Sequence, residues 1–131
     1  MEALQVKSNG RIQFVDITSR VRDTISKSGV RDGFAVIFVP HTTAGVTINE
    51  AADPAVVEDI KEKLAKLVPH SDSYRHMEGN SDAHIKATLV GSSVHVIISD
   101  GAPVLGTWQG IFFCEFDGPR SRKIFVQIVP S

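Results

Sequence analysis

The chain has 131 residues, 42% hydrophobic and 22% charged, which is enough for one domain, residues 1–131, with its own core. A formal net charge of -1, with scattered Lys and Arg, excludes the basic patches of proteins that bind nucleic acids or anionic membranes. A single cysteine, no N-terminal leader pattern and no apolar run near the roughly 20 residues of a membrane span predict a cytoplasmic protein without an internal disulfide.

The N-terminal region predicts two strands and a helix. Two alternating runs flank the Asn-Gly pair at 9–10, a dipeptide that favours a tight two-residue turn, so we expect a β-hairpin. An apolar face with four-residue spacing begins at Ile17 and predicts a helix. Thr18 or Ser19 is expected to cap its start, and Gly29 to mark its end.

The middle of the chain predicts a buried strand followed by a helix. The run GFAVIFVP, residues 33–40, is continuously apolar and rich in β-branched and aromatic residues. Asp53 and Pro54 then form a strong helix start, because a proline in the first turn loses no hydrogen bond. Apolar residues from Val57 to Leu67 give this helix one apolar face.

The C-terminal half begins with a polar loop, 69–80, and a short helix capped by Asn80 or Ser81. Three strands follow, with a turn expected at DGPR between the last two; they are SVHVIIS, GIFFCEF and RKIFVQIV. The order β-β-α-β-(β)-α-α-β-β-β predicts a single α+β domain with about three helices on a mostly antiparallel sheet.

The segment RHMEGNSDAHIKA, residues 75–87, concentrates groups that can carry chemistry. If a helix starts at Ser81, its free N–H groups and the close approach allowed by Gly79 can bind an anion such as phosphate. His84 would face the same space. The alternative is that the polar residues 80–82 only satisfy the helix end and its dipole.

A second polar segment, HTTAG, directly follows the expected buried strand, a position where scaffolds often present functional groups. His41 is a candidate acid–base group, with the hydroxyls of Thr42 and Thr43 beside it. His41, His76 and His84 can also be pictured as three imidazole ligands of a divalent metal with water in the open position. Their spacing matches no compact metal motif, and imidazoles also transfer protons without a metal, so both interpretations stay open.

Carboxylates give further candidates. Glu50, Glu78 and Asp82 are candidate proton carriers or magnesium ligands, because hard divalent ions prefer carboxylate oxygens. The alternative is that Asn49 and Glu50 only lead into the following helix. Cys114 is expected as a buried thiol on the same strand face as its aromatic neighbours, or else as a thiolate lining the site.

Two groups near the C-terminus can hold a ligand. Trp108 and Gln109 can stack a flat ring and hydrogen-bond its edge, although Trp108 also suits a core or a subunit interface. Arg120 can clamp a phosphate, although with Arg122 and Lys123 it can equally solvate a hairpin end. His70 and His95 are interpreted as a loop residue and a strand residue.

The segments HTTAGVTINE, HMEGNSDAHIKA and GTWQGIFFCEFDGPR occur in this order, and through them the chain resembles the YjbQ family of conserved hypothetical proteins, also described as secondary thiamine-phosphate synthases. The resemblance implies an α+β subunit with an antiparallel sheet, assembled as a homotrimer, in which the polar cluster forms a pocket. The implied activity joins a pyrimidine methyl diphosphate to a thiazole phosphate, giving thiamine phosphate and pyrophosphate.

That reaction has plain physical needs. A leaving diphosphate needs a cation, helix N–H groups or arginine, and the pyrimidine ring needs a flat surface with polar contacts. The residues we expect to meet these needs are Asn80, Ser81 and Arg120 for the diphosphate, Trp108 and Gln109 for the ring, His41 or His84 for protons, and Glu50, Glu78 or Asp82 for magnesium. No organic cofactor is expected.

Two other functions stay open. One is a metal-dependent hydrolase of a phosphorylated or acylated metabolite, in which the histidines hold zinc or another transition metal and water is the nucleophile. The other is a homotrimer that binds a phosphorylated metabolite without turning it over. Detection of a chemical product separates these classes.

Overall fold

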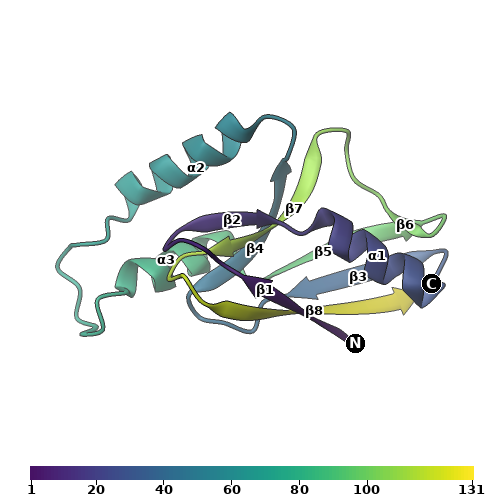
Figure 1. The fold of residues 1–131 in the computed structure, drawn as a ribbon, viewed down its shortest axis with the longest axis horizontal. Helices are drawn as coiled ribbons and strands as arrows, with labels where there is room; N and C mark the ends of the chain where they lie inside the picture. Colours follow the sequence, from purple (N-terminus) through teal and green to yellow (C-terminus); the bar gives the residue numbers. More distant parts are fainter.

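The computed structural model describes residues 1–131 as a single α+β domain with three helices, which confirms the predicted fold class (Figure 1). The helices are α1 (Thr18–Ser28), α2 (Pro54–Leu67) and α3 (Ser81–Val90). The strands are β1 (Glu2–Lys7), β2 (Gln13–Asp16), β3 (Gly33–Phe38), β4 (Ala44–Glu50), β5 (Ser93–Ser99), β6 (Ala102–Pro103), β7 (Gln109–Glu115) and β8 (Ser121–Pro130). None of the helices is long and apolar enough to cross a membrane.

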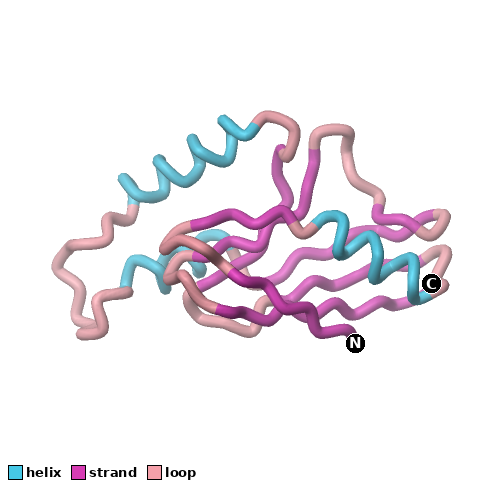
Figure 2. Tube along the Cα trace, viewed as in Figure 1, coloured by secondary structure: helices cyan, strands magenta, loops and turns pink.

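The strands form two antiparallel sheets (Figure 2). One has five strands in the order β1-β8-β3-β5-β6, and the other has three in the order β2-β7-β4. The main core contains 15 buried apolar residues from the inner faces of both sheets and from α1. Because side chains alternate along a strand, Phe113 of β7 enters this core while Phe112 and Cys114 point to the opposite face.

The opposite face of the three-stranded sheet holds a second apolar cluster, which α3 and α2 cover. Phe112, Cys114 and Phe116 pack there with alanines of α3, and Val57 and Leu64 of α2 pack against them. No residue of α2 is itself buried. Burial raises the pKa of the Cys114 thiol, so the structure favours the interpretation of a core thiol over a thiolate in the site.

The predicted hairpin at 9–10 is wrong, because the two runs around it belong to different sheets. β1 pairs with β8, whereas β2 pairs with β7. Residues between them cross from one sheet to the other, and Ser8 N donates to Arg120 O at 3.0 Å while Gly118 N donates to Arg11 O at 2.9 Å. The DGPR connection likewise carries the chain from β7 in one sheet to β8 in the other.

The helix ends were predicted in part. Asp53 accepts a bond from Ala55 N at 2.9 Å and Gly29 ends α1 with φ 74°, both as expected. Thr18 is not a cap but the first residue of α1, and its N–H donates to Asp16 Oδ1 at 2.9 Å. Asn80 stands at the start of α3 without making a capping bond, since its side chain is used elsewhere.

A close backbone contact joins β4 to the end of α3. A Cβ at Gly45 would lie 2.6 Å from the carbonyl oxygen of Gly91, and Val46 N donates to the same oxygen at 3.1 Å. This contact places the segment before β4 beside α3, which is where the site lies.

We predict that Gly45→Ala destabilises the fold by about 1–3 kcal/mol, because the added methyl meets backbone that cannot move aside. Chemical denaturation of the variant measures the change. Gly10→Ala is the matched control, since a Cβ there meets nothing closer than 3.8 Å. Equal stability of the two variants would contradict the assigned contact.

Candidate functional site

Two of the predicted histidines line one cavity of about 400 Å³ at the contact between the 41–44 segment and α3. The cavity is lined by His41, Thr42, Ala44, His84, Ala87, Thr88, Gly91 and Ser92. Thr43, the second predicted hydroxyl of the HTTAG segment, is buried and does not line the cavity. The structure therefore brings together two candidate groups that lie far apart in the sequence.

His41 is held in one orientation and one charge state. Its Nε2 accepts a hydrogen bond from the Lys123 backbone N–H at 2.9 Å. Burial and the nearby charge of Arg122 lower the pKa of His41, so the imidazole is neutral at pH 7. Because Nε2 is the acceptor, the proton of the neutral ring is assigned to Nδ1, which makes His41 a hydrogen-bond donor at that atom.

His84 is paired with His76. Their rings meet edge to face, with centroids 5.4 Å apart and an interplanar angle of 87°, and His76 Nε2 lies 3.6 Å from Glu78 Oε2. His76 and Glu78 are exposed, as is Gly79 beside them. The predicted cluster around residues 75–87 thus reaches the cavity through His84.

The three-histidine metal site does not fit these side chains as they lie in one chain. Nowhere do three His, Cys, Asp or Glu side chains come together as a metal-binding group. His76 and His84 are adjacent, but the Nε2 of His41 is engaged by Lys123.

Asp82 is buried and fully paired, in contrast to its predicted role as a proton carrier or magnesium ligand. Its carboxylate accepts hydrogen bonds from Arg11 at 2.9 and 2.8 Å and from Lys86 Nζ at 2.8 Å. It also contacts His70 Nδ1 at 3.1 Å. Although burial alone would raise the pKa of Asp82, the bonds from Arg11, Lys86 and His70 hold it well below its usual range. A permanently ionised, shielded carboxylate fixes α3 in place rather than exchanging protons.

A second buried carboxylate lies behind His41, and sequence reasoning missed it. Glu115 accepts bonds from Ser8 Oγ at 2.8 Å and Arg122 Nε at 2.9 Å, and Arg122 Nη2 also donates to Thr43 Oγ1 at 2.9 Å. Burial would raise the pKa of Glu115, but Arg122 and Ser8 lower it overall. The sequence did contain a signal for this pair. Glu115 and Arg122 occupy inward positions of two apolar strands, and charged side chains are rarely buried there unless they are paired.

Arg120 and Asn80, both predicted ligand residues, meet at Asp117. Arg120 Nε donates to Asp117 O at 2.9 Å and its Nη2 to Asp117 Oδ2 at 3.1 Å. Asn80 Nδ2 donates to the same Oδ2 at 2.9 Å, which leaves Asn80 Oδ1 buried without a partner. Ser81, the first residue of α3, follows directly. The start of α3 is therefore tied to the β7–β8 connection.

The other predicted residues lie at the far end of the three-stranded sheet. In the β4–β7 register, Ala44 is opposite Glu115, whereas Glu50 is opposite Gln109. Six residues of strand separate these ends, a distance of roughly 20 Å. Asn49, Glu50, Trp108 and Gln109 therefore do not join the histidine cavity within one chain. Trp108 is 64% exposed, which excludes the core alternative.

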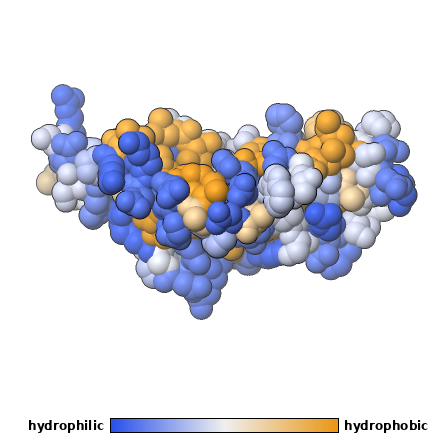
Figure 3. Space-filling view, turned by 90° about the horizontal axis from the view of Figure 1, so that it is seen from above, coloured by the Kyte–Doolittle hydropathy of each residue, from blue (hydrophilic) through white to orange (hydrophobic).

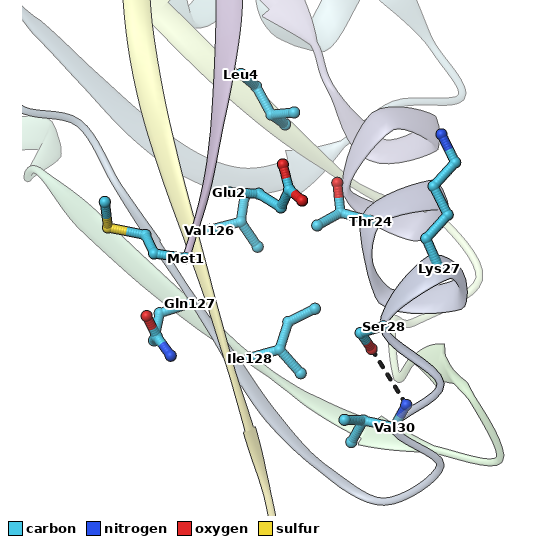
Figure 4. A pocket seen from close by; sticks show the side chains of 10 residues that line it. All are labelled: Met1, Glu2, Leu4, Thr24, Lys27, Ser28, Val30, Val126, Gln127 and Ile128. Atoms are coloured by element: carbon cyan, nitrogen blue, oxygen red, sulfur yellow. Dashed lines mark hydrogen bonds between the residues drawn. The ribbon is translucent and has the colours of Figure 1, made fainter.

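A cavity of about 410 Å³ also lies between β1, β8 and α1 (Figure 4). Its lining includes Leu4, Val126 and Ile128, and its charged residues are Glu2 and Lys27. It contains no histidine or cysteine, so we assign the candidate site to the cavity of His41 and His84.

We predict that Asp82→Asn lowers the free energy of unfolding by about 3–5 kcal/mol at pH 7, because Lys86 would keep a buried charge without its partner. Asp82 contributes stability above its ordinary pKa of 3.8, and this contribution is lost as the pH falls below that value. The variant should therefore show a shallower acid loss of stability. Denaturation curves between about pH 2 and 7 measure both effects.

The matched control is Asp100→Asn, which breaks an exposed pair with Arg31 and should change little. If Asp82→Asn behaved like this control, the buried cluster would not be a stabilising element.

Comparison with known proteins gives consistent matches along the chain. The family model described as UPF0047 protein YjbQ-like matches residues 2–131. UPF0047 protein MJ1081 of Methanocaldococcus jannaschii is 59% identical over 125 residues, covering 95% of this chain and 91% of that protein. UPF0047 protein YugU of Bacillus subtilis is 46% identical over 130 residues, covering 98% of each.

Solved structures share the fold. A crystal structure of an uncharacterized conserved protein of this family from Clostridium acetobutylicum has a TM-score of 0.97 and 55% identity, covering 98% of this chain and all of that one. Conserved hypothetical protein TT1486 from Thermus thermophilus has a TM-score of 0.92 and 40% identity, with 98% and 100% covered. The chain belongs to the YjbQ-like UPF0047 family.

Proposed function

We propose that this protein is a cytoplasmic transferase that acts on phosphorylated small molecules, with thiamine-phosphate synthase activity, which can be a secondary one. The observation that carries the proposal is the cavity lined by His41 and His84, where His41 bonds to the backbone of Lys123, the residue after Arg122. It offers a hydrogen-bond donor and an acid–base group in one place, and the charges of Arg122 and Arg120 act on the His41 imidazole.

The proposed reaction places its charge on the leaving group. The thiazole nitrogen forms a bond to the methylene carbon of the pyrimidine, the bond from that carbon to the diphosphate oxygen breaks, and pyrophosphate leaves. Negative charge grows on the departing oxygen, where preorganised donors are most effective. Arg120 and the backbone N–H of Ser81, the first residue of α3, are the donors we assign to this charge.

The two histidines receive different roles. Neutral His41 donates from Nδ1, because its Nε2 already accepts the Lys123 N–H. His84, which lines the opposite wall from α3, is the residue we assign to proton transfer. Thr42 adds an exposed hydroxyl beside them.

Magnesium is proposed to enter with the diphosphate rather than to be held by three histidines. Glu78 is the candidate carboxylate nearest the histidine pair, since Asp82 is shielded and Glu50 lies at the far end of β4. Ions of this kind are commonly bound by one or two carboxylates together with substrate phosphates.

We also propose that the protein assembles as a homotrimer through the outer face of the five-stranded sheet. Phe34 lies opposite Ile97 on β5 and Val129 on β8, and Phe38 lies opposite Phe125. Phe34, Phe38 and Ile97 are 43%, 42% and 64% exposed. Contiguous exposed apolar surface of this kind commonly marks an interface.

The surface view also shows apolar areas among hydrophilic ones (Figure 3).

The residues at the far end of the three-stranded sheet can serve the substrate ring only if a second subunit brings them to the cavity. These residues are Asn49, Glu50, Trp108 and Gln109.

The activity is tested by incubating purified protein with the pyrimidine diphosphate, the thiazole phosphate and magnesium, with and without chelator. Thiamine phosphate is read by the fluorescence of its oxidised form. We expect product, lowered about 100-fold or more in His84→Ala and lost with chelator. Lys66→Ala, on the exposed side of α2, is the control and should keep full activity.

No product above the enzyme-free blank would exclude the synthase. Retained binding of a phosphorylated substrate without product would then favour the binding-only function, whereas release of phosphate would favour the hydrolase.

For the assembly, Ile97→Lys is expected to convert the trimer to monomers, because a charge would be buried in the apolar interface. Light scattering after size exclusion measures the mass. A monomeric wild type, or a variant of unchanged mass, would contradict the proposed interface.

A further inference from the structure

Two arginines near the cavity are each held by a carboxylate. The two arginines are two residues apart in the chain, and so are the two carboxylates. Glu115 binds Arg122, and Asp117 binds Arg120, across the connection from β7 to β8. In both pairs the arginine uses its Nε and Nη2 atoms. The Nη1 group of each arginine donates to no acceptor in the protein.

The unused Nη1 of Arg122 is not sealed in the core. The side chain of Arg122 is only 3% exposed. Among the fully enclosed nitrogen and oxygen atoms of side chains, however, only Asn80 Oδ1 has no hydrogen-bond partner. Nη1 of Arg122 has no partner either and is therefore not completely enclosed. Arg120 is half exposed, so its Nη1 is open as well.

Neither arginine lines the cavity itself, but both are connected to His41 in its wall. Arg122 Nη2 donates to Thr43, the neighbour of the cavity residue Thr42. His41 bonds to the backbone of Lys123, the residue that follows Arg122, and the charges of both arginines act on the imidazole.

We propose that Arg120 and Arg122 together bind the phosphoryl or diphosphoryl group of the ligand through their free Nη1 groups. The proposal rests on the proposed function and names the anion subsite of that function. It includes Arg122, which the sequence suggested only as part of a solvated hairpin end. Guanidinium groups match phosphate oxygens in geometry and stay charged at any working pH.

The carboxylates prepare the arginines for this task. Glu115 and Thr43 fix the plane of the Arg122 guanidinium, and Asp117 fixes that of Arg120. Less side-chain freedom is then lost when an anion binds. Ser8 adds to the order by accepting the Arg120 backbone N–H at 2.9 Å.

The test is titration calorimetry of the full chain with inorganic pyrophosphate, without magnesium, and with inorganic phosphate for comparison. We expect pyrophosphate to bind, and Arg122→Lys and Arg120→Lys each to weaken it about tenfold or more, because an ammonium cannot reproduce the paired geometry. Arg31→Lys, at an exposed arginine paired with Asp100, should stay within about twofold of wild type.

Lack of pyrophosphate binding by the wild type would overturn the proposal. So would unchanged affinity in Arg120→Lys, which is exposed and should fold even if Arg122→Lys does not. Equal losses in Arg31→Lys would mean that only general charge is involved, and would also overturn it. Pyrophosphate binding that depends on both arginines, in a protein that forms no thiamine phosphate, would keep this subsite and remove the synthase.

Discussion

The end of the molecule that carries the candidate site depends on two buried carboxylates, Asp82 and Glu115. A charge taken out of water needs partners, and an unpaired one would cost several kcal/mol. Asp82 finds Arg11 and Lys86, while Glu115 finds Arg122 and Ser8. The partners come from different elements, so satisfying these charges also fixes how the elements meet.

This constraint explains why the chain crosses between sheets where it does. The residues after β1 supply Ser8 to Glu115 and Arg11 to Asp82, so the crossing segment is bonded at both ends. Arg122 reaches Thr43 on the far side of the same cluster and thereby holds the segment that presents His41. The cavity and its support are consequently connected, because buried ion pairs hold the elements in place and the partly exposed imidazoles of His41 and His84 line the cavity between them.

Much of the local structure followed from the sequence. Apolar period and turn residues predicted the three helices, the main strands, the Asp53 cap and the glycine end of α1. The same reasoning predicted that His41 and His84 belong to a site, because one follows a buried strand and the other opens a helix in a polar segment. It could not predict strand partners, since an alternating run has the same pattern whichever sheet it joins.

The sequence predicted the candidate residues as one group, but in the structure they form two separate groups. His41, His84, Asn80 and Arg120 lie at one end of the β4–β7 pair, whereas Glu50, Trp108 and Gln109 lie at the other. Residue type indicates which chemistry a side chain can perform, but the register of the sheet decides the distance between two such side chains. The role of Asp82 could not be predicted for the same reason, because its partners Arg11 and His70 come from distant segments of the chain.

The sequence by itself determined the class of fold, the positions of the three helices and the main strands, and the polar segments that contain the candidate groups, because these depend on local pattern. Tertiary structure alone decided the division into two sheets, the pairing of Glu115 with Arg122 and the neutral, donor state of His41. Each of these depends on contacts between residues remote in the chain. Such contacts set burial and nearby charge, and burial and nearby charge set what an ionisable group does.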